Sequence, residues 1–269
     1  MNLDLIVLAA GEGKRMKEKL KNKPKISLPI MSNVSLLDCH ATFAMEAKKK
    51  GVPIQGIYVV TGYRSEFVEQ RIKLLSNHLE IPFTVIYNPF YTLSNNLVSL
   101  YLALLVCNDD FVIVNGDDVL LPKAFINLLD TAELVNGLLL AISRKDRYDE
   151  DDMKVKEEKG YLKFVGKRLA RGIEANAESV GFCVVRGMAT SLFLNIVSEL
   201  VRRKEFLNSF WLTAVQLFAQ RFNNLAFVRE VPYTAWHEFD VPADLEDFQN
   251  NPIYNDLRNY VAEIKRRLR

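Results

Sequence analysis

A glycine-rich turn near the N-terminus holds the first residues that could do chemistry. The sequence LAAGEGKRM places Gly11 and Gly13 directly after an apolar run, with Lys14 and Arg15 next. Small residues let backbone amides approach a phosphate closely. The turn matches neither of two common phosphate motifs, since a dinucleotide fingerprint needs glycine at Met16 and a P-loop needs serine or threonine at Arg15. It predicts either a nucleotide site or an ordinary strand-to-loop turn.

The segment that follows is rich in lysine. From Lys14 to Lys25 the chain carries repeated lysines and ends in KPKISLPI. Flexible cations on one loop could fold over a triphosphate. The structural alternative is a solvated basic loop.

Two aspartates end a second apolar run, FVIVNGDDVL. In open α/β sheets, ligands bind at the carboxyl ends of the strands, where Asn115 and Asp117 would lie. Mg²⁺ takes one or two carboxylates together with substrate phosphates, so a carboxylate here could hold that ion. The structural alternatives are that Asp117 caps the helix that begins near Pro122 and that Asn115 serves packing alone.

LAAGEGKRM followed by KPK resembles the opening signature of the sugar-phosphate and alcohol-phosphate nucleotidyltransferases. The resemblance implies that a glycine loop holds the base and the phosphates. The loop residues are Leu8, Ala9, Ala10, Gly11 and Gly13. It also implies catalytic roles for Arg15 and Lys25, which would neutralise the charge of the triphosphate.

The same resemblance implies a Mg²⁺ site made by two aspartates. The family has one metal-binding Asp after its central strand, which corresponds to Asp117, and Asp118 is then the less favoured ligand. The segment WHEFDVPADL resembles the family's late strand, in which Asp240 would be the second ligand. Asp244 would cap the next helix. His237 is expected to be structural, because three histidines in the whole chain cannot form a metal cluster.

The segment YNPFYTLSNNLVSLYLA indicates a branch of this family, because it lacks the Gly-Thr-Ala stretch of the hexose-phosphate enzymes. It resembles the phosphocholine and inositol-1-phosphate cytidylyltransferases, in which a helix of Asn-x-x-Ser-Leu character begins beside nucleotide and acceptor. The resemblance therefore favours CTP as the donor. The further nucleotide contacts that it implies are Asn88, Asn95, Asn96, Ser99 and Asn115.

The acceptor end is expected from two later segments. Glu178 and Gly181 in ESVGFCVVRG match the family's acceptor-side strand, and Lys167 matches a catalytic lysine that reaches the acceptor phosphate. Trp211 and Trp236 offer aromatic faces that could hold a quaternary ammonium group, with burial in the core as the alternative. The neighbours of Trp211 are not the carboxylates of the choline enzymes, so another phosphorylated alcohol, an amide or a phosphonate stays open as the acceptor.

Together these residues predict transfer of a nucleotidyl group, CMP from CTP, to a small phosphorylated alcohol or phosphonate with release of pyrophosphate. The acceptor phosphate is already anionic and can attack the α-phosphorus in line without a general base. A sugar-1-phosphate nucleotidyltransferase that uses UTP or GTP is the alternative within this family. A glycosyltransferase gives no reason for GEGKRM and KPK, and a non-catalytic nucleotide sensor would not need Asp117 and Asp240.

Composition excludes several other classes. The chain has 269 residues, 49% of them hydrophobic and 25% charged, which is enough to bury a core without disulfides. A net charge of +2 is too small to predict nucleic-acid binding. Three dispersed cysteines predict reduced thiols rather than a disulfide framework or zinc site. The opening MNLDLIVLAA is too short for a signal peptide or membrane span, so a cytoplasmic protein is expected, with a homo-oligomer left open.

The elements that must position these residues alternate between short apolar runs and longer amphipathic segments. That alternation predicts an α/β fold with a Rossmann-like, doubly wound, mostly parallel sheet. The resemblance specifies the nucleotide-diphospho-sugar transferase type. The expected strands are Leu3–Leu8, Gly56–Val60, Phe83–Tyr87, Phe111–Asn115 and Leu138–Ser143. The expected helices are Leu36–Lys50, Arg64–Asn77, Asn95–Val106 and Pro122–Leu129.

After Ser143 the pattern changes to alternating polar and apolar residues around Glu158–Gly160, which predicts a β-hairpin on the acceptor side. The acidic run Asp149–Asp152 is expected to be solvated. We therefore expect one domain over residues 1–250, with a nucleotide-binding part at about 1–143 and an acceptor-binding part at about 144–250. A basic helix, 251–269, would follow, with a solvated end.

Overall fold

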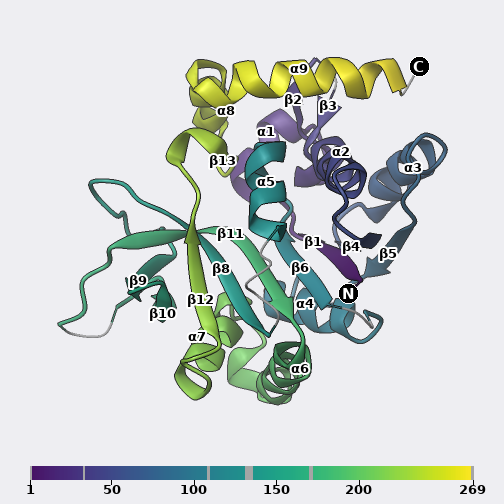
Figure 1. Ribbon diagram of the computed structural model, residues 1–269. Helices are drawn as coiled ribbons and strands as arrows, with labels where there is room; N and C mark the ends of the chain where they lie inside the picture. The colour runs from purple at the N-terminus through teal and green to yellow at the C-terminus, as the bar shows by residue number, and fades with distance from the viewer. Residues whose placement is uncertain (1, 33, 108–109, 131–135, 170–171, 268–269) are drawn as a thin grey trace.

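The computed structural model describes residues 2–32, 34–107, 110–130, 136–169 and 172–267. A nine-stranded mixed sheet runs through the molecule with helices on both faces (Figure 1). Its strand order is β5-β4-β1-β6-β11-β8-β12-β10-β9. These strands are β1 (Leu3–Ala9), β4 (Ile54–Thr61), β5 (Phe83–Tyr87), β6 (Asp110–Asn115), β8 (Gly137–Ser143), β9 (Lys154–Glu158), β10 (Tyr161–Gly166), β11 (Ala177–Arg186) and β12 (Ala226–Glu230).

The half of the sheet that contains β1 is parallel. β1 pairs in parallel with β4 and β6, and β4 pairs in parallel with β5. Successive side chains of β1 face opposite cores: Leu5 and Val7 pack on one side of the sheet, and Ile6 and Leu8 on the other. Burial on both faces explains why these strands read as continuous apolar runs. All five expected strands are present, with ends that differ by two residues at most.

The other half of the sheet is mixed. β11 runs antiparallel to both β6 and β8, whereas β12 is parallel to β8. β9 and β10 form the expected antiparallel hairpin, whose turn has Lys159 and Gly160 at φ +52° and +82°. The predicted parallel pairing therefore describes the β1 half, and the antiparallel strands β11 and β10 make the whole sheet mixed.

Two further sheets have two strands each, β2 with β3 and β7 with β13. Their strands are β2 (Pro29–Met31), β3 (Val34–Ser35), β7 (Asp118–Leu120) and β13 (Trp236–Glu238). The β7–β13 pair joins the segment after β6 to a segment late in the chain.

The helices cover the main sheet in two layers (Figure 1). They are α1 (Lys17–Leu20), α2 (Leu36–Lys49), α3 (Ser65–Ser76), α4 (Asn96–Leu104), α5 (Pro122–Leu129), α6 (Met188–Val201), α7 (Leu212–Arg221), α8 (Pro242–Asn250) and α9 (Pro252–Arg267). One apolar core lies under α2, α3 and α5, and a second lies under α4, α6 and α7. The four expected helices are found, and residues 268–269 of the expected basic helix lie outside the described residues. None of the helices in the described ranges has the length and apolar character that a membrane span needs.

The start of α2 is fixed by a buried carboxylate. Asp38 completes a capping box with Ser35, whose backbone N–H donates to Asp38 at 2.8 Å. Arg71 of α3 donates twice to the same carboxylate, at 2.7 and 2.9 Å. The Asp38 side chain is 0% exposed, so Arg71 supplies the counter-charge that a buried carboxylate needs.

Replacing Arg71 is therefore expected to destabilise the fold. Arg71→Met leaves Asp38 buried with the backbone and hydroxyl donors of its capping box alone, which should lower the free energy of unfolding by about 1–3 kcal/mol. The matched control is Arg221→Met, since Arg221 makes an equally short bidentate pair with Glu199, at 2.6 and 2.9 Å, between two exposed side chains. The control should cost less than about 1 kcal/mol. Urea unfolding measures both variants. Equal losses of unfolding free energy would contradict the inference that the burial of Asp38 makes its ion pair the more important one.

Candidate active site

A cleft of about 600 Å³ opens at the carboxyl ends of β1 and β6. The loop after β1 and the segment after β6 both reach it, as expected where the strand order of an α/β sheet reverses. It brings together most of the predicted site residues, namely Leu8, Ala9, Ala10, Gly11, Gly13, Arg15, Lys25, Asn88, Asn95, Asn96, Ser99, Asn115, Asp117, Lys167, Glu178, Gly181, Trp211 and Asp240. Trp236 does not line it.

Two glycines allow the close packing at the base of this cleft. Gly13 has φ +61°, and a Cβ there would lie 2.8 Å from Leu20 Cδ1 and 3.0 Å from Lys25 Cβ. The glycine loop therefore lies directly against the stem of Lys25. A Cβ on Gly116 would lie 2.8 Å from the Leu8 carbonyl oxygen, which accepts the Gly116 N–H at 2.9 Å. The absence of a side chain at Gly116 lets the ends of β1 and β6 meet.

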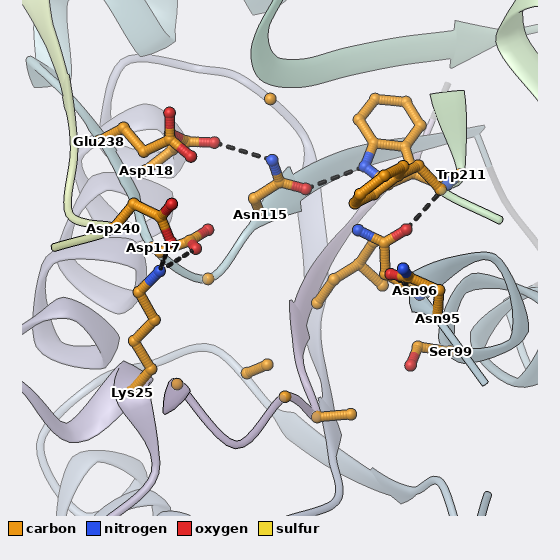
Figure 2. Close-up of a pocket in the computed structure, with 18 of the residues that line it drawn as sticks. Lys25, Asn95, Asn96, Ser99, Asn115, Asp117, Asp118, Trp211, Glu238 and Asp240 are labelled. Atoms are coloured by element: carbon orange, nitrogen blue, oxygen red, sulfur yellow. Dashed lines mark hydrogen bonds and ion pairs between the residues drawn. The ribbon is translucent and has the colours of Figure 1, made fainter. Parts of the chain in front are cut away.

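Lys25 lies between two carboxylates from distant parts of the chain (Figure 2). Its Nζ donates to Asp117 Oδ2 at 2.6 Å and to Asp240 Oδ1 at 3.0 Å. Arg15 Nη1 donates to the other oxygen of Asp240. The four residues that sequence reasoning assigned to charge neutralisation and metal binding thus form one cluster.

The β7–β13 ladder brings the two aspartates together. Glu238 pairs with Asp118 in this ladder, and the Phe239 N–H donates to the Asp117 carbonyl at 3.1 Å. Asp244 accepts the backbone N–H groups of Asp240 and Val241 and so caps α8, as predicted. Asp117 does not cap α5, which has no side-chain cap.

Sequence reasoning did not single out Glu238, although it lines the cleft beside these aspartates. Desolvation by the walls of the cleft, followed by the charges of Asp117 and Asp240, raises the pKa of Glu238 above its ordinary value. Burial and the charges of Glu238 and Asp117 also raise the pKa of Asp118 well above its usual value. Burial by itself would lower the pKa of Lys25, but the two aspartates raise it above its ordinary value, so Lys25 is a cation.

The carboxylates of Asp117 and Asp240 fit the donor set that Mg²⁺ needs. They converge on one cation, the Lys25 ammonium, from two segments of the chain. Over the residues that the structure describes, no group of three or more His, Cys, Asp or Glu side chains is arranged to hold a metal by itself. Two carboxylates completed by substrate phosphates and water are the usual way in which Mg²⁺ is bound.

A chain of hydrogen bonds links the carboxylate cluster to the far wall of the cleft (Figure 2). Asn115 Nδ2 donates to Asp118 Oδ2 at 2.9 Å, and Asn115 Oδ1 accepts the Trp211 indole N–H at 2.9 Å. The Trp211 backbone N–H donates to Asn96 Oδ1 at 2.8 Å. Trp211 is 1% exposed, so it offers almost no surface to the cleft. Its two hydrogen bonds instead tie Asn115 to Asn96 and so support the wall of the cleft.

Gly181 supports the same network from β11. It has φ +69°, and a Cβ there would lie 1.8 Å from Asp118 Oδ2 and 2.4 Å from Asn115 Nδ2. No side chain fits in that space. The Asp118–Asn115 bond therefore exists only because residue 181 is glycine.

The remaining asparagines shape the start of α4. Asn88 is buried, donates to Ser99 Oγ at 3.0 Å and accepts the Phe90 N–H at 2.9 Å. Asn95 accepts the Asn96 N–H at 2.8 Å as the N-cap of α4. These side chains thus hold the wall beside the glycine loop.

The opposite end of the cleft is lined by charged pairs. Lys167 Nζ lies 3.0 Å from Asp151 and 5.4 Å from the centre of the Phe210 ring. Lys145 joins Asp152 to the buried Glu178, at 2.9 and 2.8 Å. Asp151 and Asp152 belong to the run that was expected to be solvated rather than catalytic, and the Asp151 side chain is 75% exposed. Their place at the cleft depends on pairing between segments, which the spacing of a single acidic run does not reveal.

The structure places Trp236 in the core rather than at the acceptor end. It is 8% exposed and lies in β13, opposite Leu120 of β7. His237 is structural, as expected, because its Nε2 lies 2.9 Å from the Asp244 carbonyl oxygen and its ring packs against Phe239 and Phe248.

No model of a known protein family matches the chain, and no curated protein matches it in sequence. Its structure is similar to that of an inositol-1-phosphate CTP transferase from T. maritima, with a TM-score of 0.69 and 21% identity over 90% of each chain. It is also similar to a CTP:phosphocholine cytidylyltransferase from Streptococcus pneumoniae, with a TM-score of 0.71 and 17% identity over 93% of this chain and 99% of that one.

A UDP-glucose pyrophosphorylase complexed with UDP-glucose is similar to the same degree, with a TM-score of 0.71 and 18% identity over 93% of this chain and 98% of that one. These solved structures are nucleotidyltransferases with the nucleotide-diphospho-sugar fold. The predicted α/β fold of the nucleotide-diphospho-sugar transferase type is confirmed.

Proposed function

We propose that this protein transfers CMP from CTP to a small phosphorylated alcohol or phosphonate and releases pyrophosphate. The observation that supports this best is the cluster in which Lys25 and Arg15 meet Asp117 and Asp240. The cluster lies beside the glycine turn that follows β1. The fold is similar to that of an inositol-1-phosphate CTP transferase and a CTP:phosphocholine cytidylyltransferase, both of which use CTP. A site with both cations for a triphosphate and carboxylates for a metal suits nucleotidyl transfer.

In the proposed reaction, an oxygen of the acceptor phosphate forms a bond to the α-phosphorus of CTP. The bond from that phosphorus to the bridging oxygen breaks, and its electron pair leaves with pyrophosphate. Arg15 and Lys25 stabilise the charge that develops on the departing pyrophosphate. Lys167, at the other end of the cleft, binds the acceptor phosphate and holds it in line with the bond that breaks.

Asp117 and Asp240 would hold Mg²⁺, which when bound would act as a Lewis acid and offset the negative charge of the triphosphate. The backbone of the Gly11–Gly13 turn lines the cleft beside them and is placed to bind base and phosphates. Asn95, Asn96 and Ser99 complete the proposed nucleotide wall. Glu178 and Gly181 belong to the proposed acceptor end, with Trp211 as its buried support.

A second candidate function is transfer of UMP or GMP to a sugar 1-phosphate. The similarity to a UDP-glucose pyrophosphorylase favours it as strongly as the other structures favour a cytidylyltransferase. The two functions share the cluster around Lys25 and differ in the base and the acceptor.

The test is magnesium-dependent release of pyrophosphate with CTP, UTP, GTP and ATP. Each nucleotide is paired with phosphocholine, inositol 1-phosphate, hexose 1-phosphates and aminoalkyl phosphonates. Release that depends on CTP and on one alcohol phosphate or phosphonate is the expected result, and it names the acceptor. Release with UTP or GTP and a hexose 1-phosphate would establish the second function. No release with any pair would contradict both.

A further inference from the structure

Lys25 occupies the position between the two carboxylates that a divalent cation would need. Its Nζ is within 2.6 Å of Asp117 Oδ2 and 3.0 Å of Asp240 Oδ1, and its side chain is 14% exposed. Such contacts place the ammonium group between the two aspartates rather than toward the open cleft (Figure 2). A cation that binds both carboxylates has to take the place of this ammonium group.

The second cation of the cluster adds to the same competition. Arg15 contacts the other oxygen of Asp240, so that two unit positive charges already face the two proposed ligands. A divalent cation entering this cluster alone would displace one or both and leave them without counter-charges. Leaving the mostly buried ammonium group of Lys25 unpaired is costly.

A triphosphate removes that cost. Its oxygens give Lys25 and Arg15 new anionic partners in the same cleft, and the two aspartates are then free to bind the metal. Lys167 follows the same pattern at the other end of the cleft, where Asp151 holds it at 3.0 Å in place of a substrate phosphate.

We propose that Lys25 is an internal competitor for the metal, so that the protein binds a divalent cation weakly until a nucleoside triphosphate draws Lys25 away from Asp117 and Asp240. The part of this inference that concerns the triphosphate rests on the proposed function. Metal and nucleotide therefore bind cooperatively, and Lys25 determines this cooperativity: it opposes the metal when the nucleotide is absent and assists the nucleotide when it is present.

The experiment is a titration of Mn²⁺ alone into the protein, with free Mn²⁺ measured by its electron paramagnetic resonance signal. Lys25→Met keeps an unbranched side chain of nearly the same length and removes its charge. One charge at contact distance shifts the affinity of a neighbouring group for a cation by about 10- to 1000-fold, so this variant should bind Mn²⁺ about tenfold more tightly, or better, than the wild type. The matched control is Lys23→Met on the same loop, whose Nζ lies 5.9 Å from the Phe67 ring centre, and it should bind as the wild type does.

The opposite effect is expected for the nucleotide. With Mg²⁺ present and no acceptor, Lys25→Met should bind CTP about tenfold more weakly, or worse, in isothermal titration calorimetry. Arg15→Met provides a second variant in case Lys25→Met does not fold, because Arg15 is half exposed and contacts Asp240 alone of the two aspartates. It should also tighten Mn²⁺ binding and weaken CTP binding.

Equal Mn²⁺ affinities in the wild type, Lys25→Met and Arg15→Met would overturn the inference. The Mn²⁺ titration requires neither nucleotide nor turnover. Failure of the pyrophosphate assay would therefore count against the proposed function, and equal Mn²⁺ affinities would count against the competition by Lys25.

Discussion

Asp117→Ala is expected to lower kcat for pyrophosphate release by a factor of about 10²–10³, the usual cost of removing one preorganised electrostatic contact. Asp117 makes the shorter of the two contacts with Lys25, at 2.6 Å, and is one of the two carboxylates that would hold Mg²⁺. The side chain is partly exposed and does not cap α5, so the fold should be retained. Steady-state kinetics with the best substrate pair measures kcat, and a thermal melt measures whether the fold is retained.

Asp146→Ala is the matched control for this variant. Asp146 is an exposed aspartate that does not line the cleft, and its loss should leave kcat within about twofold, as for a surface substitution away from special features. A reduction at Asp117 of less than about tenfold, with normal melting, would contradict its assignment as a ligand of the catalytic metal.

Gly181→Ala is expected to damage both the fold and the site. The new Cβ would lie 1.8 Å from Asp118 Oδ2, a distance at which one of the two groups must move, and the backbone would have to hold alanine at φ +69°. Overpacking and the left-handed backbone together should cost about 2–5 kcal/mol. Because Asp118 lies next to Asp117 and bonds Asn115, kcat should also fall.

Gly160→Ala separates the two causes of destabilisation, which are crowding by the new Cβ and the left-handed backbone. Gly160 has φ +82° in the β9–β10 turn, and a Cβ there meets nothing within 4 Å, so this variant bears only the backbone cost of about 1–2 kcal/mol. A second comparison is the double variant Gly181→Ala with Asp118→Ala, which removes the closest clash and should regain part of the lost stability. Equal unfolding free energies for Gly181→Ala and Gly160→Ala in urea would show that crowding at Asp118 has no effect.

The parallel half of the fold could be predicted from the sequence because its strands are buried on both faces. Leu3–Ala9 is a nearly uniform apolar run, as is the interior of β6 (Asp110–Asn115), and each is followed by turn residues or polar groups. The direction of β11 could not be predicted in the same way. Its residues 180–185 are as apolar as a parallel strand, and only its partners, β6 and β8, show that it runs the other way.

Much of the candidate site could also be predicted, since a glycine turn, a lysine loop and strand-end aspartates are local patterns. Trp236 could not be placed, because whether an aromatic ring faces a cleft or the core depends on its strand partner. Glu238 did leave a signal in the sequence. It precedes Asp240 by two residues, and in extended chain that spacing puts both side chains on one side.

The pairing of β13 with β7 also sets the order in which the cluster is completed as the chain is synthesised. The glycine turn, Lys25 and Asp117 all leave the ribosome more than a hundred residues before Asp240 does. Until Trp236–Glu238 emerges and pairs with β7, Lys25 has one carboxylate partner. A nascent chain that has already formed the parallel half of the sheet is therefore still without the second carboxylate partner of Lys25, and the cluster is complete only after residue 240 has been made and β13 has paired with β7.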